Sequence, residues 1–130
     1  NHFVDPSTAD LDADPAGSSS LKRFKRLEQL LTPESGYSVH GTLNPQEIVK
    51  ILRDRIDPDT MIESPLGTLD DDSSLATNGA IYAIVFDPGS LHFWVASGEI
   101  PVPEQTFTGF SLGELLDLPG ATPVDPEFIE

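Results

Sequence analysis

The sequence has 130 residues, with seven basic against 22 acidic side chains, a formal net charge of −15 and no cysteine. The length suits one domain, and the missing cysteine excludes disulfides, Cys-ligated zinc and a thiol nucleophile within this chain. The negative charge argues against binding to a nucleic-acid backbone or an anionic membrane, and no apolar run approaches the roughly 18 residues of a membrane helix.

The charge is unevenly distributed along the chain. All seven basic residues lie between Lys22 and Arg55, so residues 1–55 are nearly neutral, whereas residues 56–130 contain acids and no base. Such a segment fits a basic partner, an environment of high salt or an ordinary solvated acidic surface, and composition does not choose among them.

The first half of the sequence predicts a loop followed by two helices. Residues 4–20 are rich in Asp, Pro, Ser and Gly, which is typical of a surface loop. Helical spacing over residues 21–31 predicts a helix, with Ser19 or Ser20 as its N-cap and Pro33 beyond its end.

The second predicted helix has a clear start. Asn44 is a good N-cap, Pro45 suits the first helical position and Glu47 the third. The apolar stripe of this helix, which the Asp-Pro pair at 57–58 closes, consists of Ile48, Val49, Ile51, Leu52 and Ile56.

The second half predicts strands. Residues 57–78 form another loop, and the β-branched and aromatic runs 80–86 and 91–96 predict a hairpin with its turn at 87–90. Residues 106–110 are a candidate short strand, and a short helix begins at Ser111 or Gly113 and runs to Leu118. We expect residues 119–130 to form a loose tail.

This order predicts the α+β class, with helices on one side of an antiparallel sheet. The strand at 80–86 is apolar on both faces, which is typical of a strand held between two layers. A hairpin alone is marginally stable, so we expect a partner segment outside this chain to complete the sheet. Phe93 and Trp94 point to opposite faces: one belongs to the core, and the other packs on a helix or lines a substrate pocket.

Arg23 occupies an unexpected position on the first predicted helix. On a helical wheel it falls among the apolar residues, between Leu30 and Leu27, whereas Lys22, Lys25 and Arg26 fall on the opposite, water-facing side. A guanidinium directed toward the packed side needs an anionic or carbonyl partner. It either extends to the edge and pairs with a nearby Asp of the 10–14 segment, or is held inside a functional site.

Several short motifs occur together in this order: Asn1-His2-Phe3, a Pro/Asp-rich stretch, and Ser20-x-x-Arg23-x-x-x-Leu27-x-x-Leu30. With Leu52-Arg53-Asp54, the hairpin and Gly98-x-x-Pro101 after them, the chain resembles the second half of the acyl-coenzyme A:6-aminopenicillanic acid acyltransferase family of N-terminal-nucleophile hydrolases. The resemblance covers most of residues 1–118.

The resemblance implies a four-layer αββα fold, here as the C-terminal part of a single catalytic domain. Members of the family cleave their own precursor to expose an N-terminal cysteine. This cysteine attacks an amide or thioester, and its own α-amino group acts as the base. Asn1 matches an oxyanion-hole donor of the family, and Arg23 matches an arginine near the nucleophile.

The missing cysteine is the main departure from the family. The nucleophile would lie in an upstream part of the same enzyme, either lost by truncation or separated by processing. Asn1 is unsuited as the nucleophile, because an amide lacks the required oxygen or sulfur. We therefore expect this chain alone to be inactive and to need two partners: the upstream half and a small acyl-amide or thioester substrate. We expect no nucleic acid, membrane, metal or cofactor.

The histidines and one acidic cluster have simpler interpretations. His2 orients its loop or is structural. His40 and His92 lack metal-ligand spacing, so they are interpreted as structural or exposed residues. Asp70, Asp71 and Asp72 lack the alternation of a calcium loop and are interpreted as a solvated loop. The alternative to a catalytic fragment is a non-catalytic acidic α+β interaction module. The fragment predicts an exposed apolar surface where layers are missing, whereas the module predicts a closed core and a locally paired Arg23.

Overall fold

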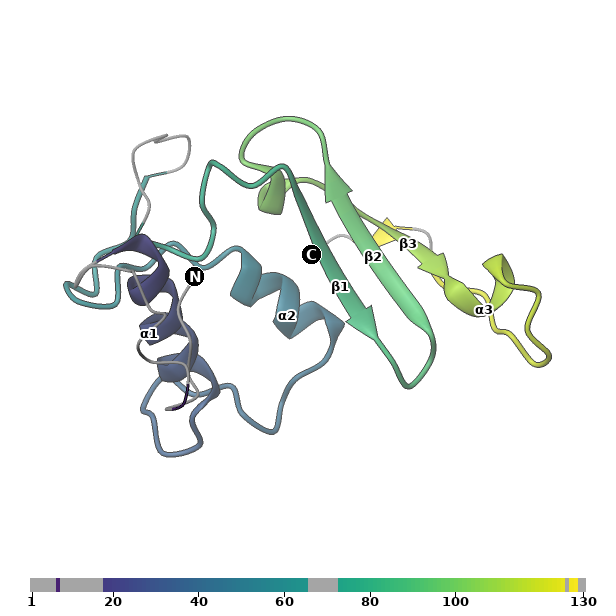
Figure 1. The fold of residues 1–130 in the computed structure, drawn as a ribbon, viewed down its shortest axis with the longest axis horizontal. Helices are drawn as coiled ribbons and strands as arrows, with labels where there is room; N and C mark the ends of the chain where they lie inside the picture. Colours follow the sequence, from purple (N-terminus) through teal and green to yellow (C-terminus); the bar gives the residue numbers. More distant parts are fainter. Residues whose placement is uncertain (1–6, 8–17, 66–72, 126, 129–130) are drawn as a thin grey trace.

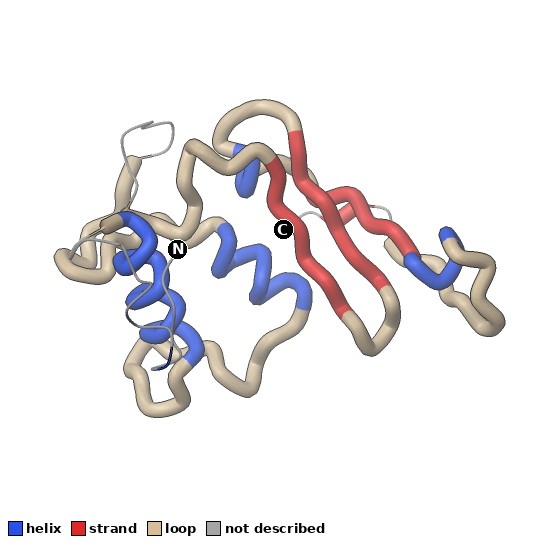
Figure 2. The backbone as a smooth tube through the Cα atoms, viewed as in Figure 1, coloured by secondary structure: helices blue, strands red, loops and turns tan. Residues whose placement is uncertain are grey.

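A computed structural model describes residues 7, 18–65, 73–125 and 127–128 of the chain. The protein has an α+β fold, as predicted, and α2 lies beside the antiparallel sheet with α1 beyond it (Figures 1 and 2). The strand order in the sheet is β1-β2-β3-β4. The described elements are α1 (Ser19–Leu31), α2 (Pro45–Leu52), β1 (Tyr82–Asp87), β2 (His92–Ser97), the 3₁₀ helix η2 (Val102–Glu104), β3 (Phe107–Ser111), α3 (Leu112–Leu115) and β4 (Glu127–Phe128).

Helix α1 begins earlier than the sequence predicted. Its N-cap is Ser18, whose hydroxyl accepts a hydrogen bond from the Leu21 N–H at 3.3 Å. The predicted caps, Ser19 and Ser20, lie inside the helix instead. Three consecutive serines offer three chemically equivalent caps, so local sequence cannot choose among them. No helix among the described residues is long and apolar enough to cross a membrane.

The start of α2 is as predicted, and its end is not. The Asn44 side chain accepts a hydrogen bond from the Glu47 N–H at 2.9 Å, and Pro45 is the first helical residue. The helix stops at Leu52, so Ile56 is not part of its apolar stripe. Ile56 instead forms an isolated bridge with Glu63.

The predicted hairpin is present, shifted by one or two residues. Its register runs from Tyr82 opposite Ser97 to Asp87 opposite His92 without interruption. The Asp87 carboxylate stabilises the turn, because it accepts hydrogen bonds from the Gly89 N–H at 3.0 Å and the Ser90 hydroxyl at 2.8 Å.

The sheet continues beyond the hairpin, because β3 and β4 add to it. β3 confirms the strand predicted at 106–110, and α3 starts after its N-cap Ser111 but stops at Leu115 rather than Leu118. The loose tail predicted at 119–130 is wrong for residues 127–128, which form β4 and pair with β3. A two-residue strand carries no pattern of its own, so only its pairing reveals it.

The core lies on one face of this sheet. Alternate strand residues point toward α2 and η2, and the helix buries Val49 against them, with Ile48 and Leu52 partly buried beside it. Helices therefore cover one side of the sheet, as the sequence predicted. The buried apolar cluster consists of Val49, Ala83, Val85, Trp94, Ala96, Val102 and Phe107.

Gly109 allows the chain to pass close over this core. A Cβ at that position would overlap the Asp125 carbonyl oxygen and lie 2.9 Å from the Trp94 indole nitrogen. Val124, next to Asp125, packs against the core cluster. The segment before β4 thus covers the part of the sheet that α2 does not reach.

Candidate functional site

The opposite face of the sheet is apolar and exposed, and we call it the open face. The strand register places its members on one side, since residues directly opposite one another share a face. Tyr82 and Phe86 are 63% and 62% exposed, although both stand in a six-residue strand. The open face consists of Tyr82, Ile84, Phe86, Phe93, Val95, Thr108 and Phe110.

Three phenylalanines form a ladder across the open face. The ring centroids of Phe86 and Phe93 are 5.9 Å apart, and those of Phe93 and Phe110 are 5.2 Å apart, with near-parallel planes. These cross-strand contacts stabilise the sheet while leaving the outer ring surfaces in water. Phe93 thus belongs to the open face, whereas Trp94 is in the core. This confirms that the two point to opposite faces, and Phe93 is the one that lines a pocket.

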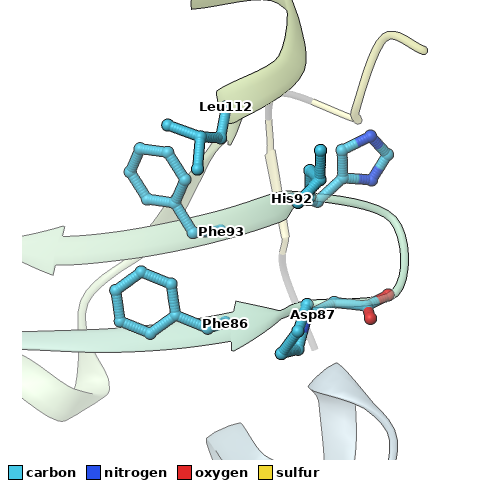
Figure 3. A pocket seen from close by; sticks show the side chains of 7 residues that line it. Phe86, Asp87, His92, Phe93 and Leu112 are labelled. Atoms are coloured by element: carbon cyan, nitrogen blue, oxygen red, sulfur yellow. The ribbon is translucent and has the colours of Figure 1, made fainter. Parts of the chain in front are cut away.

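Two hollows meet at Phe93. The first, of about 260 Å³, lies at the hairpin end (Figure 3). Its wall combines Phe86 and Phe93 with Leu112 at the start of α3. The second, of about 450 Å³, lies along β2 and β3 toward Leu115. Both hollows are mainly apolar, so this face fits apolar side chains or an apolar ligand rather than an ion.

Polar groups occur at the hairpin rim of the first hollow, where Asp87 and His92 lie (Figure 3). The Ser90 hydroxyl, followed by the Gly89 N–H, lowers the pKa of the Asp87 carboxyl below its ordinary value. His92 Nε2 lies 3.1 Å from the Thr122 carbonyl oxygen, as expected of a structural histidine. Ser90 therefore bonds to the carboxylate and not to the imidazole, so these groups do not form a nucleophile–base pair.

The predicted site residues have separate outcomes. Asn1, His2 and Asp70–Asp72 lie outside the described residues. Arg23 is half-buried in α1, where its guanidinium donates a hydrogen bond to the Ser19 hydroxyl at 2.9 Å. No residue of α1 lines either hollow, and α2 stands between α1 and the sheet (Figure 1). The described structure does not bring Arg23 to the open face.

Arg26, which the helical wheel turned toward water, is the buried arginine of α1. It is 3% exposed, so that prediction is wrong. Its Nε lies 3.0 and 3.1 Å from the two carboxylate oxygens of Asp54, and its second terminal nitrogen lies 2.7 Å from one of them. The Tyr37 ring covers the guanidinium, with 5.8 Å between the Arg26 Cζ atom and the ring centroid. This bidentate arrangement satisfies the charge that burial would otherwise leave uncompensated.

The helical-wheel prediction for Arg26 is wrong because α1 packs through the side that carries its basic residues. The segment 54–59 that follows α2 presents carboxylates to it, and Lys22 bonds to Asp57 at 2.8 Å while Lys25 pairs with Asp59. The Lys22 ammonium holds the pKa of Asp57 well below its usual range. A helical wheel assumes that apolar residues mark the packed side, but here Arg26 is buried beside Leu30, four residues further along the same side of the helix.

Arg53 is a further arginine whose contacts the sequence did not predict. It follows α2 and donates a hydrogen bond to the Pro103 carbonyl oxygen at 2.9 Å, and its guanidinium lies 5.9 Å from the Phe107 ring centroid. It thus ties the end of α2 to η2 and to the core. Its position directly after an apolar helix was visible in the sequence, but the carbonyl 50 residues away was not.

The residues that the structure describes contain no group of three or more His, Asp or Glu side chains placed to hold a metal ion. His40 is exposed. Comparison with models of protein families, with curated proteins and with solved structures gives no match for this chain.

Proposed function

We propose that this chain is the C-terminal part of an N-terminal-nucleophile amidohydrolase or acyltransferase that acts on acyl amides or thioesters. The observation that carries the proposal is the open face. A stable sheet with one face covered by a helix and the other carrying exposed aromatic rings is suited to packing against a second sheet. One helical layer and one sheet layer are half of the αββα sandwich that the sequence resemblance implies.

In this proposal, the upstream part of the enzyme supplies the second sheet and the cysteine. That part would cover Phe86, Phe93 and Phe110, and the two hollows would then lie between the layers. Asn1 would donate a hydrogen bond to the oxyanion, a contribution worth about 2.7–4 kcal/mol in other enzymes. Arg23 would lie near the nucleophile, and its bond to Ser19 holds the guanidinium against the first turn of α1.

The experiment uses the natural, mature protein. We expect mass spectrometry of the mature protein to find an N-terminal cysteine, labelled by iodoacetamide, and hydrolysis of acyl amides that this labelling abolishes. Replacing that cysteine by alanine should prevent precursor cleavage. A mature protein with no reactive N-terminal cysteine would contradict the proposal.

Two substitutions test the residues of this chain in the mature enzyme. Asn1→Ala should lower kcat about 100-fold or more with little change in KM, since the oxyanion exists only after attack. Arg23→Gln should also lower kcat/KM. Lys25→Gln is the matched control, because it removes a positive charge from the same helix at an exposed position. Equal effects of Arg23→Gln and Lys25→Gln would contradict a site role for Arg23.

The second candidate is the non-catalytic acidic interaction module. The local bond between Arg23 and Ser19 favours it, since that candidate predicts a locally paired arginine. The open face weighs against it, because the same candidate predicts a closed core. A complete natural protein that lacks hydrolase activity and binds another protein through the open face would favour the module.

A further inference from the structure

The two edges of the sheet differ in how they end. On one side, β4 has two residues, and acidic Asp125 lies close before it. A very short strand flanked by charge is a common way to prevent further pairing. On the other side, β1 has six residues and pairs with β2 over its whole length without a bulge.

The outer edge of β1, which we call the free edge, lacks the usual protection. The first five residues of β1, from Tyr82 to Phe86, include no charged residue, no proline and no glycine, and its single charge is Asp87, the last residue before the hairpin turn. Within the described part of the chain, no backbone hydrogen bond joins β1 to a segment other than β2. Natural sheets rarely leave a regular edge strand with five uncharged residues in a row unpaired, because its amides would pair with any available strand.

The surroundings of the free edge specify the chemistry of a strand that would pair there. On the covered face it would continue the row of Ala83 and Val85 beneath α2, where Leu52 is still only partly buried. On the open face it would lie beside Tyr82 and Phe86. A fitting strand is therefore apolar on both sides, as expected inside a layered fold.

The charge of the chain argues against a second copy as the donor. Each copy carries a formal charge of −15, so two copies joined at this edge would bring two strongly acidic chains together. A donor that is neutral or basic meets no such repulsion.

We propose that a neutral strand, apolar on both faces, pairs with the free edge of β1 and extends this sheet. The inference rests on the proposed function for the source of that strand, which is the upstream part that carries the cysteine. That part would contact this chain twice, through a layer over the open face and through a strand at the edge.

Amide hydrogen exchange measured by NMR tests the pairing. In the 130-residue chain alone, every second amide of β1 should exchange rapidly, since only the others bond to β2. In the mature natural protein those rapid amides should slow by about 100-fold or more. The amides of β2, paired on both sides, are the internal control and should change far less. Unchanged rates at the free edge would overturn the inference.

A photoreactive benzoylphenylalanine in place of Ile81, which is 81% exposed directly before β1, identifies the donor. Cross-linking in the mature protein to the segment that begins with the cysteine would support both proposals. Cross-linking to a cysteine-free segment would keep the edge pairing and overturn the proposed function. Cross-linking to a second copy, or concentration-dependent protection of β1 in the isolated chain, would overturn the inference.

Discussion

The two ends of this molecule are held together by different forces. Around α2 and the sheet, buried apolar side chains such as Phe107 and Val49 make the contacts. Around α1, the contacts to the segment 54–59 include ion pairs from Lys22, Lys25 and Arg26 and a hydrogen bond from the Gln29 amide to the Pro58 carbonyl oxygen. The ion pair of Arg26 is nearly excluded from water. We therefore expect acid to weaken the charged end more than the apolar end, and salt to weaken its exposed ion pairs. A helix with a strong apolar stripe can thus be positioned by its charges.

The largest expected effect is on the apolar end. Phe107→Ala removes a fully buried ring and should lower the free energy of unfolding by about 3–5 kcal/mol. Phe86→Ala is the control, because its ring lies on the open face, and it should cost less than about 1 kcal/mol in the isolated chain. Urea unfolding measures both. Equal losses would mean that the open face is as well packed as the core.

The next effect concerns the buried pair. Arg26→Met leaves the Asp54 carboxylate without its partner, and we expect a loss of about 3 kcal/mol. Arg26→Met combined with Asp54→Leu should recover most of that loss, since no uncompensated charge then remains. Thermal unfolding of the two variants provides the test. A double variant no better than the single one would show that the pair itself stabilises α1.

Acid should weaken the charged end first. The pKa of Asp57 is lower in the folded chain than in the unfolded chain, mainly because of Lys22, so the unfolded state binds more protons as the pH falls. The stabilisation is complete above about pH 5 and is lost progressively as the pH falls below that value, by roughly 1 kcal/mol for a partly exposed pair. In Lys22→Met, unfolding measured between pH 5 and pH 2 should depend less on pH. An unchanged slope would contradict this origin.

The smallest effect is expected at the outermost pair. Lys25 and Asp59 have side chains about half exposed, so Lys25→Met should change the free energy of unfolding by no more than about 0.5 kcal/mol. That difference should vanish in 1 M NaCl, whereas the loss caused by Arg26→Met should persist. Guanidinium is unsuitable for this measurement because it is itself a salt, so urea is used. A salt-independent effect of Lys25→Met would imply contacts other than charge.

Local chemistry explains which elements the sequence could predict. Asn44-Pro45 with Glu47 specifies a helix start within four residues, and the hairpin has both its strand residues and its turn residues in one short stretch. The open face was also foreseeable as an exposed apolar surface. These features depend on neighbours in the chain, so the spacing contains the information.

The features that were not predicted depend on distant partners. Asp54, the partner of Arg26, is 28 residues away, so the wheel had no reason to turn that arginine inward. The tail at 127–128 becomes a strand only because β3 is beside it. The site shares this limit: the phenylalanine ladder follows from strand alternation, but the relation of Arg23 to the sheet depends on how α1 is positioned.

The positions of the ion pairs and of Val124 also bear on synthesis, since a chain emerges from the ribosome with its N-terminal side first. Every group that holds α1 to its acidic segment has been made once Asp59 is added. The covered side of the sheet is completed only after Val124 and β4 have been synthesised, more than sixty residues later. During that interval α2 is already available to cover Ala83 and Val85, but the part of the sheet around Trp94 and the whole open face of the hairpin are uncovered. The period of greatest aggregation risk is therefore the interval between completion of β2 and arrival of the segment that crosses Gly109.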